Sequence, residues 1–142
     1  MRKRTLHVAY RVSDLDRSLR FYSAVGYVEI GRVSPRAGWT LVMLKLPDDE
    51  FVTLELVREE DLALSVGTGF SHLVVQVDDL EATCDALREQ GITPEQIEVH
   101  GDPDVEEVTK TSFLFDPDGY RIELVQWPDG HADGLTEADC AG

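Results

Sequence analysis

Hydrophobic and polar residues alternate over residues 6–12 (LHVAYRV), which predicts a half-buried strand with Leu6, Val8, Tyr10 and Val12 on one face. Leu15, Leu19, Tyr22 and Val25 recur near the helical period, which predicts a helix with one apolar stripe. Ser13 or Asp14 is expected to cap this helix and Gly26 to end it. Three more strands are expected in this half of the chain, over residues 27–34, 39–46 and 51–58.

The second half of the chain repeats this β-α-β-β-β pattern. His7 falls on His72 and Asp14 on Asp79, and after a short insertion residues 54–57 fall on residues 122–125. The repeat predicts a strand near 71–77, a helix at 79–90, and strands near 95–100, 108–115 and 120–127, with a turn at 116–119 (DPDG). We therefore expect one α+β domain over residues 1–127, made of two tandem βαβββ modules, 5–60 and 70–127, with a glycine-containing link at 66–69.

Each module carries one His and one Glu on the strand face opposite its apolar row. In the first strand, His7 and Arg11 point away from that row, and His72 does the same in the repeat. Glu55 and Glu123 each lie between apolar neighbours in the last strand of a module. A single His or Glu there is more often structural or solvated, but the duplicated pair favours a divalent-metal site with mixed N and O ligands.

Composition supports a single folded domain and argues against nucleic-acid or membrane partners. The chain has 142 residues, 42% of them hydrophobic, and a net charge of −15 that repels phosphate and anionic lipid. Residues 1–58 carry ten Lys and Arg against seven Asp and Glu, and residues 59–142 carry three against 21. Either the acidic half is a solvated surface, or the two halves face each other within or between chains.

Several features predict where chemistry is absent. No apolar run reaches the ~20 residues of a membrane span, and no signal-peptide stretch opens the chain, so we expect a soluble, cytoplasmic protein. Cys84 and Cys140 form neither a disulfide framework nor a CxxC metal site. His100 and His131 lack the placement of the paired histidines and are expected to bind nothing. Residues 128–142 have no apolar period and are expected to form a mobile tail.

Three segments, HVAYRVSDLDRSLRFY, GTGFSHLVVQVDDL and FLFDPDGYRIELV, resemble glyoxalase I (lactoylglutathione lyase) of the vicinal oxygen chelate superfamily. The similarity spans about residues 5–127, although the wording of the first segment is common to the whole superfamily. The resemblance implies curved mixed sheets around a metal site, with His7, Glu55, His72 and Glu123 as the metal ligands.

The resemblance also implies a reaction. In the family, a hemithioacetal of methylglyoxal and a thiol binds the metal through vicinal oxygens, a glutamate removes the C1 proton, and reprotonation at C2 gives an S-lactoyl thioester. By this likeness Glu123 is the leading catalytic base, and Glu55 serves the opposite proton face. Arg11 matches the arginine that holds the thiol's carboxylate, and an ion pair with a neighbouring acid is its equal alternative.

Family members of this size imply a homodimer with two active sites, each combining the first module of one chain with the second module of the other. They also favour nickel or cobalt, with zinc possible. Two departures bear on the thiol cosubstrate: Glu59 stands where related bacterial sequences usually have Asn, and the loop at 102–110 is acidic where the family tends to be basic. The thiol, glutathione or another, is therefore left open, as is a substrate that is no thiol adduct.

Other functions fit the same superfamily. An acyl-thioester epimerase resembles this pattern with Gln in one carboxylate position, so Glu55 argues against it. An extradiol dioxygenase or a thiol transferase resembles a site of two His and one Glu, so a fourth ligand at Glu55 argues against both. From a different class, an antibiotic-binding or other small-molecule-binding protein of this fold uses an aromatic groove between chains, which Trp39 and Trp127 are placed to line. Such binders typically lack the His and Glu set found here, so metal content separates the classes.

Overall fold

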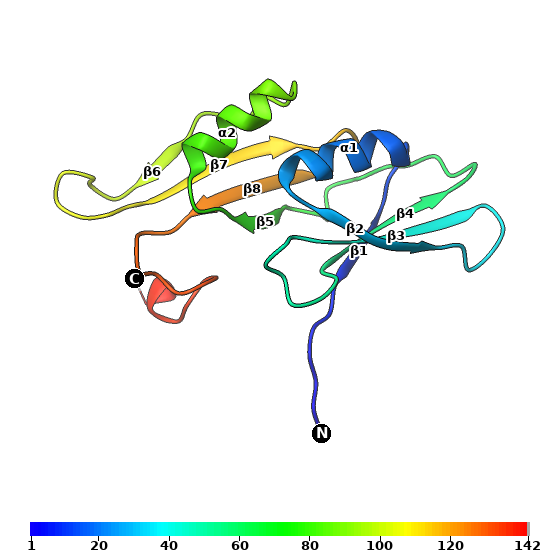
Figure 1. Cartoon of the computed structure of the whole chain (residues 1–142), viewed down its shortest axis with the longest axis horizontal. Helices are drawn as coiled ribbons and strands as arrows, with labels where there is room; N and C mark the ends of the chain where they lie inside the picture. Colours follow the sequence, from blue (N-terminus) through cyan, green and yellow to red (C-terminus); the bar gives the residue numbers. More distant parts are fainter. Residues whose placement is uncertain (142) are drawn as a thin grey trace. The chain divides into compact units, whose positions relative to one another are not determined.

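The computed structural model describes residues 1–141 and divides into two compact units (Figure 1). The first unit holds residues 1–69 together with the turn at 116–119, and the second holds residues 70–115 and the chain from Tyr120 onward. The boundary falls beside the glycine-containing link at 66–69. Each unit contains the elements of one βαβββ module, which confirms the predicted fold class.

The first unit is a four-stranded mixed sheet with one helix. Its strands lie in the order β1-β4-β3-β2, with β1 parallel to β4 and the other neighbours antiparallel. The first and last strands of the module are therefore adjacent, although a helix and two strands separate them in sequence. The elements are β1 (Val8–Arg11), α1 (Leu15–Val25), β2 (Val28–Val33), β3 (Trp39–Lys45) and β4 (Leu54–Glu59).

The second unit repeats this topology, with strand order β5-β8-β7-β6 and β5 parallel to β8. The strand expected near residues 95–100 is shorter in the structure, where β6 begins at Glu98. A 3-10 helix, η1 (Ala138–Cys140), lies near the C-terminus. The other elements are β5 (Leu73–Gln76), α2 (Leu80–Glu89), β6 (Glu98–His100), β7 (Thr109–Phe115) and β8 (Arg121–Gln126).

Equivalent aspartates begin both helices. The Asp14 side chain accepts a hydrogen bond from the Arg17 backbone N–H at 3.1 Å, and Asp79 accepts one from the Ala82 N–H at 3.0 Å. Of the two expected caps of α1, Asp14 is the one the structure uses. Gly26 ends α1 with φ 126°, a conformation that favours glycine, as the sequence predicted.

Of the four residues in the expected stripe of α1, only Tyr22 is buried. Phe21, Tyr22 and Ser18 are its buried residues, whereas Leu15 and Leu19 are only half-buried. Tyr22 makes a polar contact inside the first unit: its hydroxyl donates to Asp116 Oδ2 at 2.8 Å and also contacts the Tyr10 hydroxyl. Burial, with the neighbouring Tyr10 and Asp116, raises the pKa of Tyr22 far above its ordinary value. Tyr22 is therefore a neutral core donor.

The sheets supply most of the remaining core. In the first strand, burial begins at Tyr10 and Val12, while Leu6 and Val8 of the same expected row are exposed. Fully buried side chains of the strands are Val42, Leu44, Leu54, Leu56, Leu114, Ile122 and Leu124.

Between residues 1 and 141 we find no helix with the length and apolar character needed to cross a membrane.

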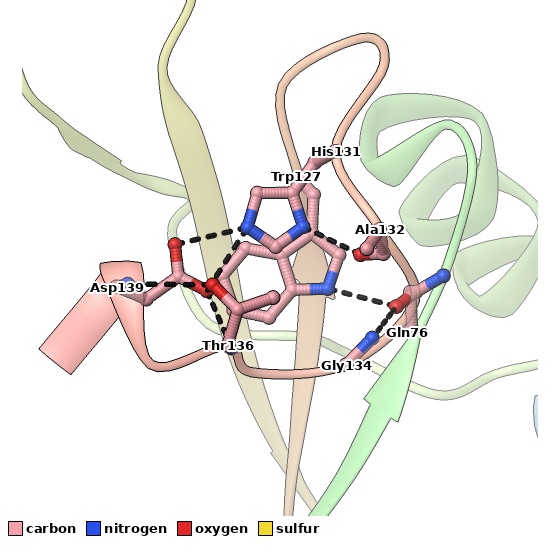
Figure 2. Close-up of polar contacts among 7 residues, drawn as sticks. All are labelled: Gln76, Trp127, His131, Ala132, Gly134, Thr136 and Asp139. Atoms are coloured by element: carbon pink, nitrogen blue, oxygen red, sulfur yellow. Dashed lines mark hydrogen bonds and ion pairs between the residues drawn. The ribbon is translucent and has the colours of Figure 1, made fainter.

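The C-terminal segment packs on the end of the second sheet (Figure 2). The His131 ring stacks on Trp127, with centroids 4.4 Å apart and planes 11° from parallel. His131 Nε2 lies 2.9 Å from Asp139 Oδ1, and the Thr136 hydroxyl donates to Asp139 Oδ2 at 2.9 Å. The mobility expected of this segment stays a prediction, and these contacts define what its motion has to break.

Candidate metal centre

The first module brings His7 and Glu55 together. Ala9 of β1 is the register partner of Glu55 on β4, so His7, two residues before Ala9, lies diagonally across from Glu55 on the same face. His7 Nε2 lies 3.3 Å from Glu55 Oε1, and both side chains are partly accessible to solvent. We call these two residues the first half-site.

The second module repeats the arrangement with His72 and Glu123. Val74 of β5 is the register partner of Glu123 on β8, and His72 Nε2 lies 3.0 Å from Glu123 Oε2. The other ring nitrogen of His72, Nδ1, is 2.8 Å from the Ser71 hydroxyl, and the edge of the ring meets Phe113. These contacts orient the imidazole with Nε2 toward the carboxylate. We call His72 and Glu123 the second half-site.

The two half-sites have the donor chemistry of a divalent-metal site. Two ligand atoms, each about 2.1 Å from one ion and roughly at right angles, lie about 3 Å apart, which is the separation found in both pairs. With Nε2 of His72 as a metal ligand, Nδ1 would carry the proton and donate to the Ser71 hydroxyl, the kind of outer contact that orients a metal-binding imidazole. Within residues 1–141 no three His, Cys, Asp or Glu side chains gather as a metal cage. Each unit thus offers two donors.

Arg11 lies on the same face as the first half-site and is paired with Glu59. The guanidinium donates from Nε to Glu59 Oε2 at 3.1 Å and from Nη2 to Oε1 at 3.3 Å. The Glu59 side chain is only 11% exposed, against 52% for Arg11. Of the two alternatives that the sequence left for Arg11, the ion pair is the contact present in the structure. Its partner is the residue that departs from the family pattern.

The second module has a neutral pair at the equivalent place. The repeat that sets His7 on His72 also sets Arg11 on Gln76 and Glu59 on Trp127. The Trp127 indole N–H donates to Gln76 Oε1 at 2.8 Å (Figure 2). The Gln76 amide also donates to Asp133 Oδ1 at 2.8 Å, so the C-terminal segment contacts it. The internal repeat is the signal in the sequence that sets these two positions side by side.

Arg121 is a further residue on the face of the second half-site that the sequence analysis missed. It precedes Glu123 by two positions on β8 and therefore shares its face. Its guanidinium lies 3.7 Å from the centroid of the Phe113 ring and 3.9 Å from Glu95 Oε2. The Phe113 ring therefore contacts both His72 and Arg121 and lies beside the second half-site.

The two other histidines and Trp39 have partners outside the half-sites. His100 Nε2 lies 2.8 Å from the Thr111 hydroxyl on the neighbouring strand, and His131 belongs to the C-terminal segment. The hydrogen bond to Asp139, together with one to the Ala132 carbonyl, raises the pKa of His131. Trp39 stacks under the Arg36 guanidinium at 4.6 Å.

Comparison with known proteins shows the family of this chain. The Glyoxalase/Bleomycin resistance protein/Dioxygenase superfamily matches residues 4–124. The lactoylglutathione lyase of Haemophilus influenzae is 37% identical over 127 residues, covering 85% of this chain and 90% of that protein. The lactoylglutathione lyase of Escherichia coli O157:H7 is 33% identical over 132 residues, covering 89% and 94%.

A solved structure extends the likeness to three dimensions. The glyoxalase I of Leishmania major, described as trypanothione-dependent, superposes with a TM-score of 0.68 at 28% identity, covering 88% of this chain and 87% of that one. Sequence and structure agree over nearly the whole chain, and both repeat modules are included. The chain therefore belongs to the Glyoxalase/Bleomycin resistance protein/Dioxygenase superfamily, as a lyase of the glyoxalase I type.

Proposed function

We propose that this protein is a metal-dependent glyoxalase I that isomerises the hemithioacetal of methylglyoxal and a low-molecular-weight thiol to an S-lactoyl thioester. The observation that carries the proposal is the duplicated His and Glu pair, with separations of 3.3 and 3.0 Å at equivalent positions of the two modules. The lactoylglutathione lyases among the relatives support the same reaction class.

Four residues would hold the divalent ion: His7, Glu55, His72 and Glu123. Nickel or cobalt is favoured, and zinc is possible. When bound, the ion supplies stabilisation of the negative charge that builds on the two vicinal oxygens of the substrate as the proton leaves C1. The imidazoles contribute neutral nitrogen donors and the glutamates contribute charged oxygens, a mixed set suited to these metals.

Glu123 is proposed as the base that removes the C1 proton and returns it to C2. One of its oxygens lies beside His72, so the carboxylate is held at a defined place on the sheet face. Phe113 and Arg121 restrict the space beside it. Glu55, on the equivalent strand of the other module, would serve the opposite proton face of the substrate. A positioned carboxylate of this kind contributes about 10²–10⁴-fold to a proton transfer.

A four-donor site has to join a first half-site with a second, and we propose that the two come from different chains of a homodimer. The opposite charge of the two parts of the chain supports a pairing between chains, since residues 1–58 carry net +3 and residues 59–142 net −18. One dimer would then hold two sites.

Mixed dimers test this arrangement. One chain carries His7→Ala with Glu55→Gln, the other carries His72→Ala with Glu123→Gln, and the two are unfolded, mixed and refolded together. Sites shared between chains restore one intact site in each mixed dimer, so activity reappears on mixing. If each site lies within one chain, every site is damaged and mixing restores nothing.

The function itself is tested by metal content and turnover. Mass spectrometry of the purified protein should find about one ion per chain, and methylglyoxal turnover should follow with one of a panel of thiols after nickel, cobalt or zinc is added. Metal without turnover for any thiol would move the chemistry to another branch, such as an acyl-thioester epimerase. Failure to bind any metal would leave a small-molecule-binding protein of this fold.

A further inference from the structure

The ion pair of Arg11 and Glu59 lies on the same sheet face as the first half-site and bears on which substrate binds there. Arg11 lies four residues along β1 from His7, and Glu59 lies four residues along β4 from Glu55. At ~3.3 Å per residue this places the pair about 13 Å from the half-site, on the same face. A thiol adduct held at the half-site and extended along these two strands reaches the pair with the end remote from its sulfur.

The Arg11 fork already holds a carboxylate there. Glu59 accepts from Nε and Nη2, the edge of the guanidinium that matches a carboxylate in two parallel hydrogen bonds. The backbone carbonyl of Glu59 accepts from the Arg58 guanidinium, and exposed Glu60 and Asp61 follow in the chain. A substrate carboxylate arriving at this edge has to displace Glu59 and meets its negative charge.

The part of the chain after residue 58 offers little to replace this cation. After residue 58 the sequence contains three Lys and Arg residues, and each lies within 4 Å of an acid. In the second module the position equivalent to the Arg11 and Glu59 pair is the neutral Gln76 and Trp127 pair. Both half-sites therefore present a polar pair with no net charge, in a chain whose total charge is −15.

We infer that Glu59 is a specificity-determining residue: it compensates the charge of Arg11 and selects a cosubstrate thiol whose far end carries neutral polar groups, not a free carboxylate. This inference rests on the proposed function. It names the class of thiol, a small molecule rich in hydroxyl or amide groups, that hydrogen-bonds to an ion pair without breaking it.

The test compares glutathione with its diethyl ester, in which both carboxylates are masked. Hemithioacetals of methylglyoxal with each thiol are given to the metal-loaded wild type and to Glu59→Gln. In the wild type, kcat/KM should be higher for the ester. Glu59→Gln should raise kcat/KM for the glutathione adduct about three- to tenfold, the effect of one partly exposed charge, and leave that for the ester within about twofold.

Glu29→Gln is the matched control. It removes a glutamate from another Arg pair of the same unit, with Arg32 at 2.6 Å, on β2 at the far edge of the sheet from β1. This variant should leave the ratio between the two thiols unchanged. If Glu29→Gln shifts the ratio as much as Glu59→Gln does, net charge explains the effect and the inference is overturned.

A binding measurement separates this inference from the proposed reaction. Calorimetry with S-hexylglutathione and its diethyl ester, which cannot react, should show tighter binding of the ester to the wild type and a smaller difference in Glu59→Gln. Equal affinities, or tighter binding of S-hexylglutathione by the wild type, overturn the assignment of Glu59. The absence of turnover with every thiol, when the ester still binds more tightly, contradicts the proposed reaction alone.

Discussion

The two modules of this chain agree at one pair of positions and differ at the next. His7 with Glu55 and His72 with Glu123 have the same residue types, the same diagonal placement and nearly the same separation. Four residues further along the same strands, the first module has the charged Arg11 and Glu59, and the second has the neutral Gln76 and Trp127. The two modules therefore share the His and Glu donors and differ in the charge of the neighbouring pair.

The physical basis of the agreement is the strand register. In each module the first strand runs parallel beside the last, with Ala9 opposite Glu55 and Val74 opposite Glu123. A histidine two residues before the register partner therefore points to the same face of the sheet as the glutamate. The two outer pairs lie at equivalent places in the strands, but their surroundings differ. The C-terminal segment contacts Gln76 and Trp127 (Figure 2).

The largest expected effect comes from the two glutamates. Glu123→Gln should lower kcat by about 10³-fold, because the amide cannot accept the C1 proton, and Glu55→Gln should lower it less. Both variants are measured at equal metal content, and Glu81→Gln, which loses an exposed carboxylate paired with Lys110, serves as the control. Equal losses in the two variants would mean that the modules share the proton transfer, and wild-type activity of Glu123→Gln would refute its role as base.

The next effect concerns the two cores. Leu56 and Leu124 are equivalent in the repeat, and both side chains are fully buried. Replacing either by Ala should lower the free energy of unfolding by about 2–5 kcal/mol, because each leaves a cavity. Urea unfolding followed by circular dichroism measures both. A single transition that shifts equally in the two variants indicates that the units unfold together, whereas two transitions would show that they do not.

A smaller effect is expected at the neutral pair. Trp127→Phe removes the indole N–H that Gln76 accepts and keeps an aromatic ring for His131 to stack on. The free energy of unfolding should fall by about 1 kcal/mol, and hydrogen exchange at the Gly134 amide, which also donates to Gln76, should become faster. Unchanged exchange at Gly134 would show that the segment is held by other contacts.

The smallest effect is the pH dependence of the C-terminal segment. The hydrogen bond to Asp139 raises the pKa of His131 above 6.5, so this contribution is complete below pH 6.5 and is lost as pH rises through the raised pKa. The hydrogen bond from His131 lowers the pKa of Asp139 from 3.8 to about 2, so its contribution is present above 3.8 and lost as pH falls toward 2.

Protection of the segment should therefore be greatest between about pH 4 and 6.5. Amide exchange by NMR across this range measures it, together with the titration of the His131 ring. His131→Gln should remove the dependence above pH 6.5 and leave the second half-site unaffected. A ring that titrates at or below pH 6.5 would contradict the contact with Asp139.

Most of the architecture could be predicted from local pattern. Alternation, helical spacing and turn residues are properties of neighbouring positions, and they placed both helices and all eight strands to within a few residues. The burial of Tyr22 follows from its place in the helical stripe, but its partner does not. Tyr22 bonds to Asp116, which lies far along the chain, where helical spacing gives no information about it.

The positions of the His and Glu pairs also follow from the amino-acid pattern, since a period of two assigns each strand residue to a face and the repeat doubles the signal. The partner of Arg11 does not follow from that pattern. Its charge is equally suited to a substrate or to a neighbouring acid, and the choice depends on β4 bringing Glu59 beside β1. The same holds for residues 128–141, whose contacts with Gln76 join positions 57 and 58 residues apart, a pairing that arises from folding and that no local pattern encodes.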